Sequence, residues 1–171
     1  MTEKKIFLTS IMVIGISCKI FSQVDTTLPP FKRFPTLPPL QILLSDSVTK
    51  YTRDDLPKKT PVLIMLFSPD CSHCQHTAEE LIKYKEDIKD FQIVMTTMHP
   101  LWQMNSFVEK YHLKELKNVV IGKDVRYIMP SFYNVKTLPF LAFYNKKGNL
   151  ITTFQGSMPL KRIIETFKQN K

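Results

Sequence analysis

An unbroken apolar run that ends at two closely spaced cysteines constrains the fold of this chain more than any other feature. The run spans residues 61–67, Pro-Val-Leu-Ile-Met-Leu-Phe, and such a run is typical of a central strand covered on both faces. Cys71 and Cys74 follow after a short polar turn, and from Ser72 onward the apolar positions recur at helical spacing. The sequence therefore predicts that both cysteines lie where a buried strand gives way to a helix.

Strand and helix patterns alternate along the rest of the chain. Predicted strands cover residues 41–44, 48–52, 91–95, 118–122, 138–144 and 150–154, and the first and last pairs of strands form hairpins. Predicted helices run from Ser72 through the spaced positions Cys74, Ala78, Leu81, Ile82 and Ile88, over 102–113, and over 159–169. Trp102, in the second predicted helix, is interpreted as a core or helix-packing residue. His99, which follows a predicted strand, and His112, in the second helix, are interpreted as surface or loop residues. This alternation, closed by a hairpin, predicts a three-layer α/β domain.

The N-terminus has the layout of a secretory signal. Lys4 and Lys5 precede an apolar stretch over residues 6–16, which as a helix would reach only about 16 Å, against a hydrocarbon core of about 30 Å. We expect residues 1–22 to be removed after export. The segment before Cys18 also weakly resembles a lipoprotein signal, in which Cys18 becomes the lipidated first residue.

The remaining length fits one domain. Residues 23–39 are rich in proline and are interpreted as an extended linker, which leaves residues 40–171 for the domain. The formal net charge is +9, but the lysines are scattered and no arginine-rich stripe accompanies them. We therefore expect a solvated basic surface and no nucleic-acid site.

The spacing of the two cysteines permits thiol-disulfide exchange. A cysteine at a helix N-terminus is favoured as a thiolate, because unpaired N–H groups and the helix dipole attract negative charge. Cys71 is thus the candidate nucleophile, and Cys74 would attack the mixed disulfide that Cys71 forms with a partner. His73 can stabilise the Cys71 thiolate, whereas the Asp70 carboxylate disfavours a second negative charge nearby.

Three other interpretations of the pair remain open. A structural disulfide across two residues closes a very short loop and gains little loop-closure entropy. A zinc or copper site would use Cys71, Cys74 and His76, although a structural zinc usually takes four ligands and the chain has no second cysteine pair. A peroxide-reducing cysteine is the third, but the strand lacks the Pro and Thr that such proteins place before the nucleophile.

Residues 66–74, Leu-Phe-Ser-Pro-Asp-Cys-Ser-His-Cys, and 135–139, Val-Lys-Thr-Leu-Pro, together resemble the thioredoxin superfamily. The likeness is to its exported TlpA/ResA-like thiol-disulfide oxidoreductases and runs from about Leu40 to Phe167. It implies a thioredoxin-like α/β/α sandwich with a central mixed sheet, here with an N-terminal hairpin extension. It also implies a cis peptide before Pro139, packing of Pro139 against the cysteine pair, and pairing of the Leu138 backbone with the substrate chain. Ser72, between the cysteines, is a further candidate for contact with the substrate.

The chain departs from that family at three positions near the pair. Asp70 stands where a tryptophan is common, Met65 where thioredoxins have a buried acid, and Thr77 where the TlpA/ResA type often has Glu. Proton transfer from Cys74 would then use Glu79, Glu80, His76 or water. The Ser-His dipeptide resembles that of oxidants and isomerases more than that of thioredoxin, so the redox direction stays open.

Together these features predict an exported enzyme, periplasmic or in the cell envelope, that exchanges disulfides with protein thiols. By resemblance, a membrane partner would keep it reduced or oxidised; we expect a monomer without cofactor or resident metal. The alternatives are a copper- or zinc-binding chaperone module and an inactive thioredoxin-like interaction domain.

Overall fold

The structure, a computed structural model, describes residues 27–170. Its strands are β1 (Gln41–Leu43), β2 (Lys50–Thr52), β3 (Val62–Leu66), β4 (Gln92–Thr97), β5 (Val119–Lys123), β6 (Phe140–Tyr144) and β7 (Leu150–Gln155). Its α-helices are α1 (Pro30–Arg33), α2 (Ser72–Lys83), α3 (Leu101–Lys110), α4 (Ile128–Tyr133) and α5 (Leu160–Gln169). The predicted alternation of strands and helices is confirmed.

All seven strands form one mixed sheet in the order β2-β1-β5-β4-β3-β6-β7. Strand β4 runs parallel to both β3 and β5, whereas the β1–β2, β1–β5, β3–β6 and β6–β7 pairs are antiparallel. Strands β1 and β2 form the predicted N-terminal hairpin, and the structure places it beyond β5 in the sheet. Strand β3, which leads to the cysteines, lies between two other buried strands.

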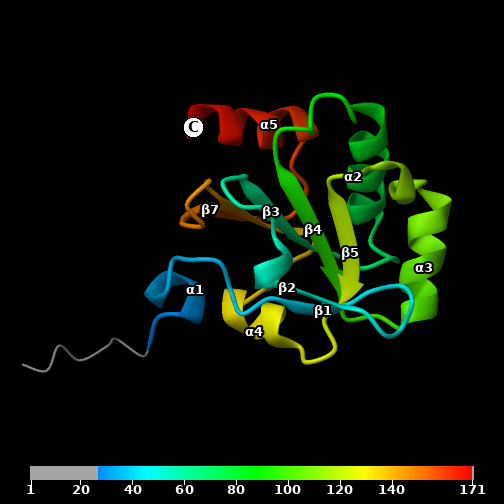
Figure 1. The fold of residues 1–171 in the computed structure, drawn as a ribbon, viewed down its shortest axis with the longest axis horizontal. Helices are drawn as coiled ribbons and strands as arrows, with labels where there is room; N and C mark the ends of the chain where they lie inside the picture. The colour runs from blue at the N-terminus through cyan, green and yellow to red at the C-terminus, as the bar shows by residue number, and fades with distance from the viewer. Residues whose placement is uncertain (1–26, 171) are drawn as a thin grey trace, which may run out of the picture.

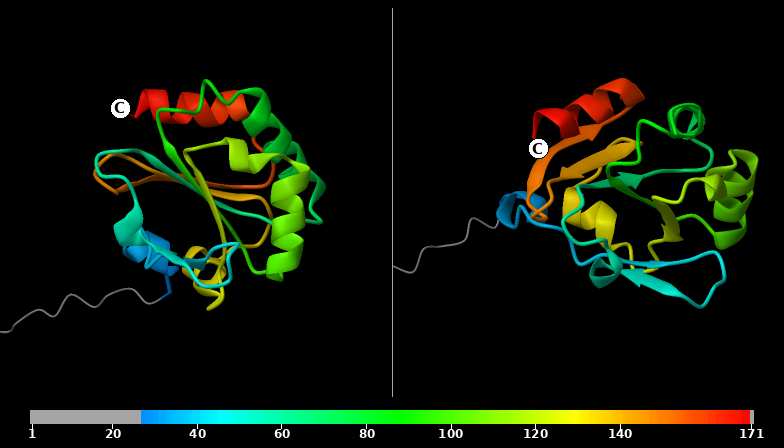
Figure 2. Two further views of the ribbon diagram at one scale, coloured as in Figure 1. Left: turned by 45° about the vertical axis from the view of Figure 1, so that its right-hand side comes forward. Right: turned by 45° about the horizontal axis from the view of Figure 1, so that its top comes forward.

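Helices cover both faces of this sheet (Figures 1 and 2). On one face Leu63 and Met65 pack in a core cluster with residues of α2, α3 and α5. On the other face Ile64 and Leu66 pack with residues of α4, and Phe31 of α1 joins this cluster. Because side chains alternate along a strand, a strand that is apolar throughout feeds both cores. The predicted three-layer α/β/α architecture is therefore confirmed.

The segment expected to be a linker contains α1 and contacts the rest of the fold. The Phe31 ring lies 5.9 Å from that of Tyr133, centroid to centroid. The Leu37 N–H donates to the Gly148 carbonyl at 3.0 Å, and the Leu150 N–H donates to the Pro35 carbonyl at 2.8 Å. These contacts attach the segment to the turn of the β6–β7 hairpin. The exact domain boundaries stay a prediction.

The predicted signal segment and Cys18 lie outside the described residues. Within residues 27–170, none of the helices has the length and apolar character needed to cross a membrane.

Two local expectations are wrong, and one short helix was not predicted. Trp102 is 67% exposed, because the buried face of α3 carries Met104, Phe107 and Val108 and the tryptophan lies on another side of the helix. Helix α2 ends at Lys83, so Ile88 reaches the core from the turns that follow. Helix α4 was not predicted; it is short and its N-cap residue has no side-chain capping bond, so no periodic pattern or capping signal marks it.

Candidate functional site

The cysteine pair lies between the carboxyl end of β3 and the first turn of α2. Cys71 is the N-cap residue of α2 and is partly exposed, whereas Cys74 is fully buried. The backbone N–H of Cys74 donates to the Cys71 Sγ at 3.4 Å, so the sulfur acts as the helix cap. Both cysteines are free thiols in the structure. A partner from solution therefore meets Cys71 first.

The two thiols differ in their electrostatic surroundings. Burial raises the pKa of the Cys74 thiol well above its usual range, and contact with the Cys71 side chain raises it further. A hydrogen bond with the backbone of Ser68 lowers the pKa, but by less than burial raises it. Cys71, by contrast, lies at the N-terminus of a twelve-residue helix that has no acidic residue in its first turn. The arrangement separates an accessible sulfur from a buried, protonated one.

A proline loop from a distant part of the chain faces Cys71. The Leu138–Pro139 peptide is cis, as the resemblance implies, and Pro139 is buried. The Cys71 thiol donates to the Leu138 carbonyl over 3.8 Å. Because this carbonyl lies at the start of β6, next to β3 in the sheet, the fold holds it beside the sulfur. The structure thus brings together Cys71, Cys74 and Leu138.

Ser72 and His73, which separate the cysteines in sequence, are exposed on the first turn of α2. The backbone carbonyl of His73 accepts a hydrogen bond from the Thr77 hydroxyl at 2.9 Å. Both side chains therefore border the surface from which a partner would approach Cys71.

His99 supports the loop that carries the cysteines, a position that the sequence did not predict. Its Nε2 forms a hydrogen bond of 3.0 Å with the Ser68 hydroxyl, and its Nδ1 one of 2.7 Å with the Gln103 side chain. The Ser68 carbonyl in turn accepts the N–H of Cys71 at 3.2 Å. A signal for this was present: His99 follows β4, and adjacent parallel strands such as β3 and β4 end at the same edge of the sheet.

The expected proton-transfer groups of α2 are engaged elsewhere. His76 and Glu79 lie 3.7 Å apart and are both more than half exposed, on the outer side of the helix. The Glu80 carboxylate accepts the backbone N–H of Leu160 at 3.1 Å, at the start of α5. The group that transfers the proton at Cys74 stays a prediction.

A buried carboxylate lies behind the proline loop. Asp124 is 1% exposed, and its Oδ2 accepts the backbone N–H of Met129 at 2.7 Å. Its Oδ1 and the Thr96 hydroxyl lack a hydrogen-bond partner among the described residues, and both residues line a small cavity with Leu138. No sequence signal marks Asp124, because its burial goes with its contact to α4.

Within residues 27–170, no group of three or more His, Cys, Asp and Glu side chains is arranged to hold a metal ion. At the pair itself the structure thus supplies the two sulfurs of Cys71 and Cys74, fewer donors than a structural zinc site takes.

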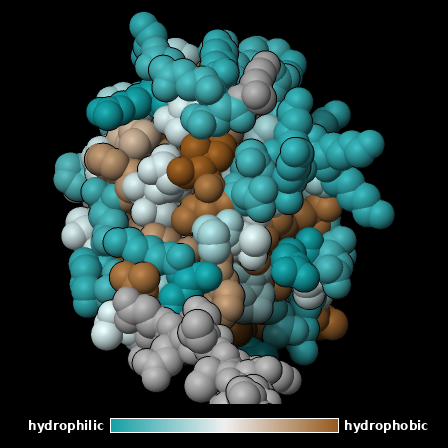
Figure 3. All heavy atoms as spheres, turned by 90° about the vertical axis from the view of Figure 1, so that its left-hand side faces the viewer, coloured by the Kyte–Doolittle hydropathy of each residue, from teal (hydrophilic) through white to brown (hydrophobic). Residues whose placement is uncertain are grey.

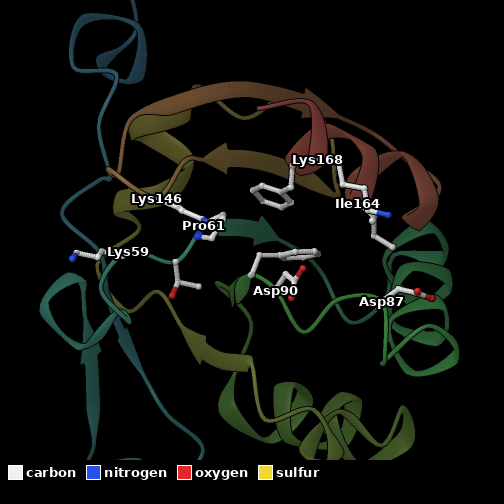
Figure 4. Close-up of a pocket in the computed structure, with 10 residues that line it drawn as sticks. Lys59, Pro61, Asp87, Asp90, Lys146, Ile164 and Lys168 are labelled. Atoms are coloured by element: carbon white, nitrogen blue, oxygen red, sulfur yellow. The ribbon is translucent and has the colours of Figure 1, made fainter. Parts of the chain in front are cut away.

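A separate hollow of about 300 Å³ lies at the other end of β3 (Figure 4). Its lining combines apolar and charged side chains, including Pro61, Phe91, Phe167, Lys146 and Asp87. Since Pro61 precedes β3 and Cys71 follows it, this hollow is remote from the cysteines.

Figure 3 views the molecule from the side where α1 lies in Figure 1, and hydrophobic residues gather in the middle of that face among hydrophilic ones.

Comparison with known proteins bears on the fold and the site. A model of the thioredoxin-like domain family matches residues 55–171, whereas no curated protein sequence matches the chain. A secreted disulfide oxidoreductase of Mycobacterium tuberculosis, described as homologous to E. coli DsbE, is similar in structure, with 20% identity and a TM-score of 0.63 over 75% of this chain and 93% of that one.

Two further solved structures are similar. A putative thioredoxin from Neisseria meningitidis shows 21% identity and a TM-score of 0.64, over 80% of this chain and 92% of that one. An exposed lipoprotein thioredoxin of Streptococcus pneumoniae shows 23% identity and a TM-score of 0.58, over 76% and 98%. At these identities the likenesses show the fold. The family match covers more than half of the sequence and agrees with the observed sheet, so the chain belongs to the thioredoxin-like domain family.

Proposed function

We propose that this protein is an exported thiol-disulfide oxidoreductase that exchanges disulfides with protein thiols through Cys71 and Cys74. The observation that supports it best is the asymmetry of the pair at a helix N-terminus. Cys71 is accessible, Cys74 is fully buried, and the Cys74 N–H contacts the Cys71 sulfur at 3.4 Å. One sulfur is thus placed to meet a partner and the other to release it.

In the reducing direction, the Cys71 thiolate attacks one sulfur of a partner disulfide. A new bond forms between Cys71 and the partner, and the second partner sulfur leaves as a thiolate. Cys74 then loses its proton and attacks the Cys71 sulfur, which closes the Cys71–Cys74 disulfide and releases the first partner sulfur. Two electrons pass to the partner, whose two thiolates take up protons. Oxidation of a dithiol partner follows the same steps in reverse.

Neighbouring residues support individual steps of this proposal. Exposed His73 can stabilise the Cys71 thiolate by charge or hydrogen bonding, and exposed Ser72 can contact the bound chain. Buried Pro139 fixes the loop that presents Leu138, whose backbone is placed 3.8 Å from the Cys71 sulfur, to a partner's backbone. Each of these roles follows from proximity to Cys71 and from the family resemblance.

Export and a membrane redox partner belong to the same proposal. The N-terminal charge and apolar pattern supports export, and two structural relatives are described as secreted or as an exposed lipoprotein. Outside the cytoplasm, thiol-disulfide exchange needs a continuing source or sink of electrons, which a membrane partner supplies. A monomer suffices, because both sulfurs come from one chain.

The experiment that tests the proposed function is a trapping assay with Cys74→Ser. Without the second thiol, the mixed disulfide at Cys71 cannot be released, so the variant should accumulate partner adducts that disappear on reduction. Cells producing this variant are quenched with acid, and the adducts are separated on non-reducing gels. The Cys71→Ser variant is the matched control and should form none. Absence of any trapped species in Cys74→Ser would contradict the mechanism.

A further inference from the structure

A groove beside the cysteine pair is open to solvent and has no role in the exchange chemistry itself. Helix α3 forms one wall through Trp102, Phe107 and Lys110, and the cysteine loop and α2 form the other through Asp70 and Gln75. The hollow measures about 290 Å³. We call it the α3 groove. Figures 1 and 2 show α3 beside α2, on the same side of the sheet.

Trp102 is the most distinctive residue of the α3 groove. It is the only tryptophan of the chain, and 67% of its surface is exposed. Phe107, which also lines the groove, is buried and packs against Phe67 and Tyr111, with ring centroids 4.8 and 4.7 Å apart. A large exposed aromatic residue beside a packed aromatic cluster is the kind of anchor that protein interfaces use.

The α3 groove is fixed relative to the reacting sulfur. The Gln75 side chain donates to the Pro69 carbonyl at 2.8 Å, which joins α2 to the cysteine loop. His99 connects Gln103 of α3 to Ser68 of the same loop. Asp70, which lines the groove, is the residue before Cys71. A polypeptide joined to Cys71 through a disulfide therefore begins at one end of the groove.

Charge gives the α3 groove a direction. Asp70 lies at the end next to Cys71, and exposed Lys110 lies on α3, two turns beyond Trp102. The Lys110 ammonium is 5.1 Å from the centroid of the Tyr111 ring, which holds the charge over an aromatic surface. A chain that leaves Cys71 along the groove thus meets an apolar surface first and a positive charge afterwards.

We propose that the α3 groove binds the polypeptide flanking the reacting cysteine of a protein substrate, with an apolar residue on Trp102 and a carboxylate near Lys110. This inference rests on the proposed function, since the cysteine link brings the chain to the groove. It assigns substrate preference to α3: acidic, apolar sequence next to the reacting cysteine is favoured over basic sequence.

Trp102 supplies the direct test, because its fluorescence is the only tryptophan signal. Cys74→Ser is converted to mixed disulfides with glutathione and with a short synthetic peptide that carries leucine and glutamate near its single cysteine. We expect tryptophan emission at shorter wavelength in the peptide adduct than in the glutathione adduct, because the peptide shields the indole from water. Equal emission from the two adducts would overturn the groove proposal.

The same adducts separate the two proposals. Their formation at Cys71, measured by intact mass, tests the exchange chemistry and does not depend on the groove. If adducts form and the emission is unchanged, the groove proposal fails alone. If Cys71 forms no adduct with either probe, the proposed function fails as well.

Kinetics give a second readout. Two rates are measured, reduction of the glutathionylated peptide and reduction of oxidised glutathione. Trp102→Ala should lower the ratio of the first rate to the second by about tenfold, the effect of losing an aromatic residue from an interface. Phe34→Ala is the matched control, because Phe34 is an exposed aromatic close to α1, and it should leave the ratio unchanged. Lys110→Glu should shift preference from the glutamate peptide to a lysine counterpart. An unchanged ratio and preference would contradict the proposal.

Discussion

At the scale of single residues, the site depends on the difference between two cysteines separated by one helical turn. Cys71 caps α2 and is accessible, whereas Cys74 lies on the buried face of the same helix. The difference arises because Cys71 is the N-cap residue, with an extended backbone outside the helix, whereas Cys74 lies in the first turn and faces the core.

The raised pKa of Cys74 leads to a prediction about pH. Because the folded protein holds the thiol protonated, this group contributes stability below the pKa of about 8.5 that a cysteine has in the unfolded chain, and loses it as pH rises towards the folded value. The free energy of unfolding of the reduced protein should therefore fall more steeply between about pH 8 and pH 10 than that of Cys74→Ala. Urea unfolding under reducing conditions measures both, and parallel profiles would contradict the assignment.

The position of the cysteine pair could be predicted from sequence because it belongs to a short local pattern, an apolar strand followed by spaced cysteines; Pro139 was assigned only through the family resemblance. The positions of His99 and Trp102 were harder to predict, because the only signal for His99 is that it follows β4. Their positions depend on which strands are neighbours and on which side of α3 faces the core, and both are tertiary properties. Trp102 was interpreted as a core residue because bulky apolar side chains are usually buried. That interpretation is wrong, because the buried face of α3 is formed by other residues.

At the scale of elements, strand β3 and helix α2 were predictable because their patterns are long and regular. Helix α4 was not, since six residues with a proline among them give no helical period. The end of α2 was also misplaced: Ile88 continues the apolar spacing although the chain has left the helix at Lys83. In both cases packing, rather than local preference, decides the structure.

One contact between elements leads to a stability prediction. The Glu80 carboxylate of α2 accepts the backbone N–H of Leu160, the first residue of α5. The N-cap residue of α5, Pro159, makes no side-chain capping bond. Glu80→Ala should lower the free energy of unfolding by about 1–3 kcal/mol, the cost of a lost charged hydrogen bond at a helix N-terminus. Urea unfolding measures the loss.

The matched control for that change is Glu79→Ala. The Glu79 side chain is 62% exposed, and its only ion-pair partner among the described residues is the exposed His76. Surface changes of this kind usually stay within about 0.5 kcal/mol. Equal losses in the two variants would show that Glu80 does not join α2 to α5.

At the scale of the whole molecule, the fold separates two ends of one sheet. The cysteines, the cis peptide and the α3 groove lie where β3 ends, whereas the Pro-rich segment packs against the turn of the β6–β7 hairpin at the opposite end. The architecture was predictable from the alternation of elements, but this placement of the N-terminal segment was not, because proline-rich sequence carries no periodic signal.

The proposed export leads to a prediction at this scale. Produced with its native N-terminus in a bacterial host, the protein should lose residues 1–22, or should begin at a lipidated Cys18. Intact-mass analysis of the mature protein distinguishes the two, and Cys18→Ser should change the mass only in the lipidated case. A mature mass that includes residues 1–17 would contradict export by either route.

Redox titration of Cys71 and Cys74 tests the central claim most directly. The protein is equilibrated in glutathione buffers of varied ratio, quenched with acid, and scored by mass after thiol labelling. The account predicts a reversible two-electron conversion between dithiol and disulfide, with a potential between about −270 and −120 mV, the range of exchange enzymes. A potential below about −300 mV, as in structural disulfides, or no disulfide at any ratio, would contradict it.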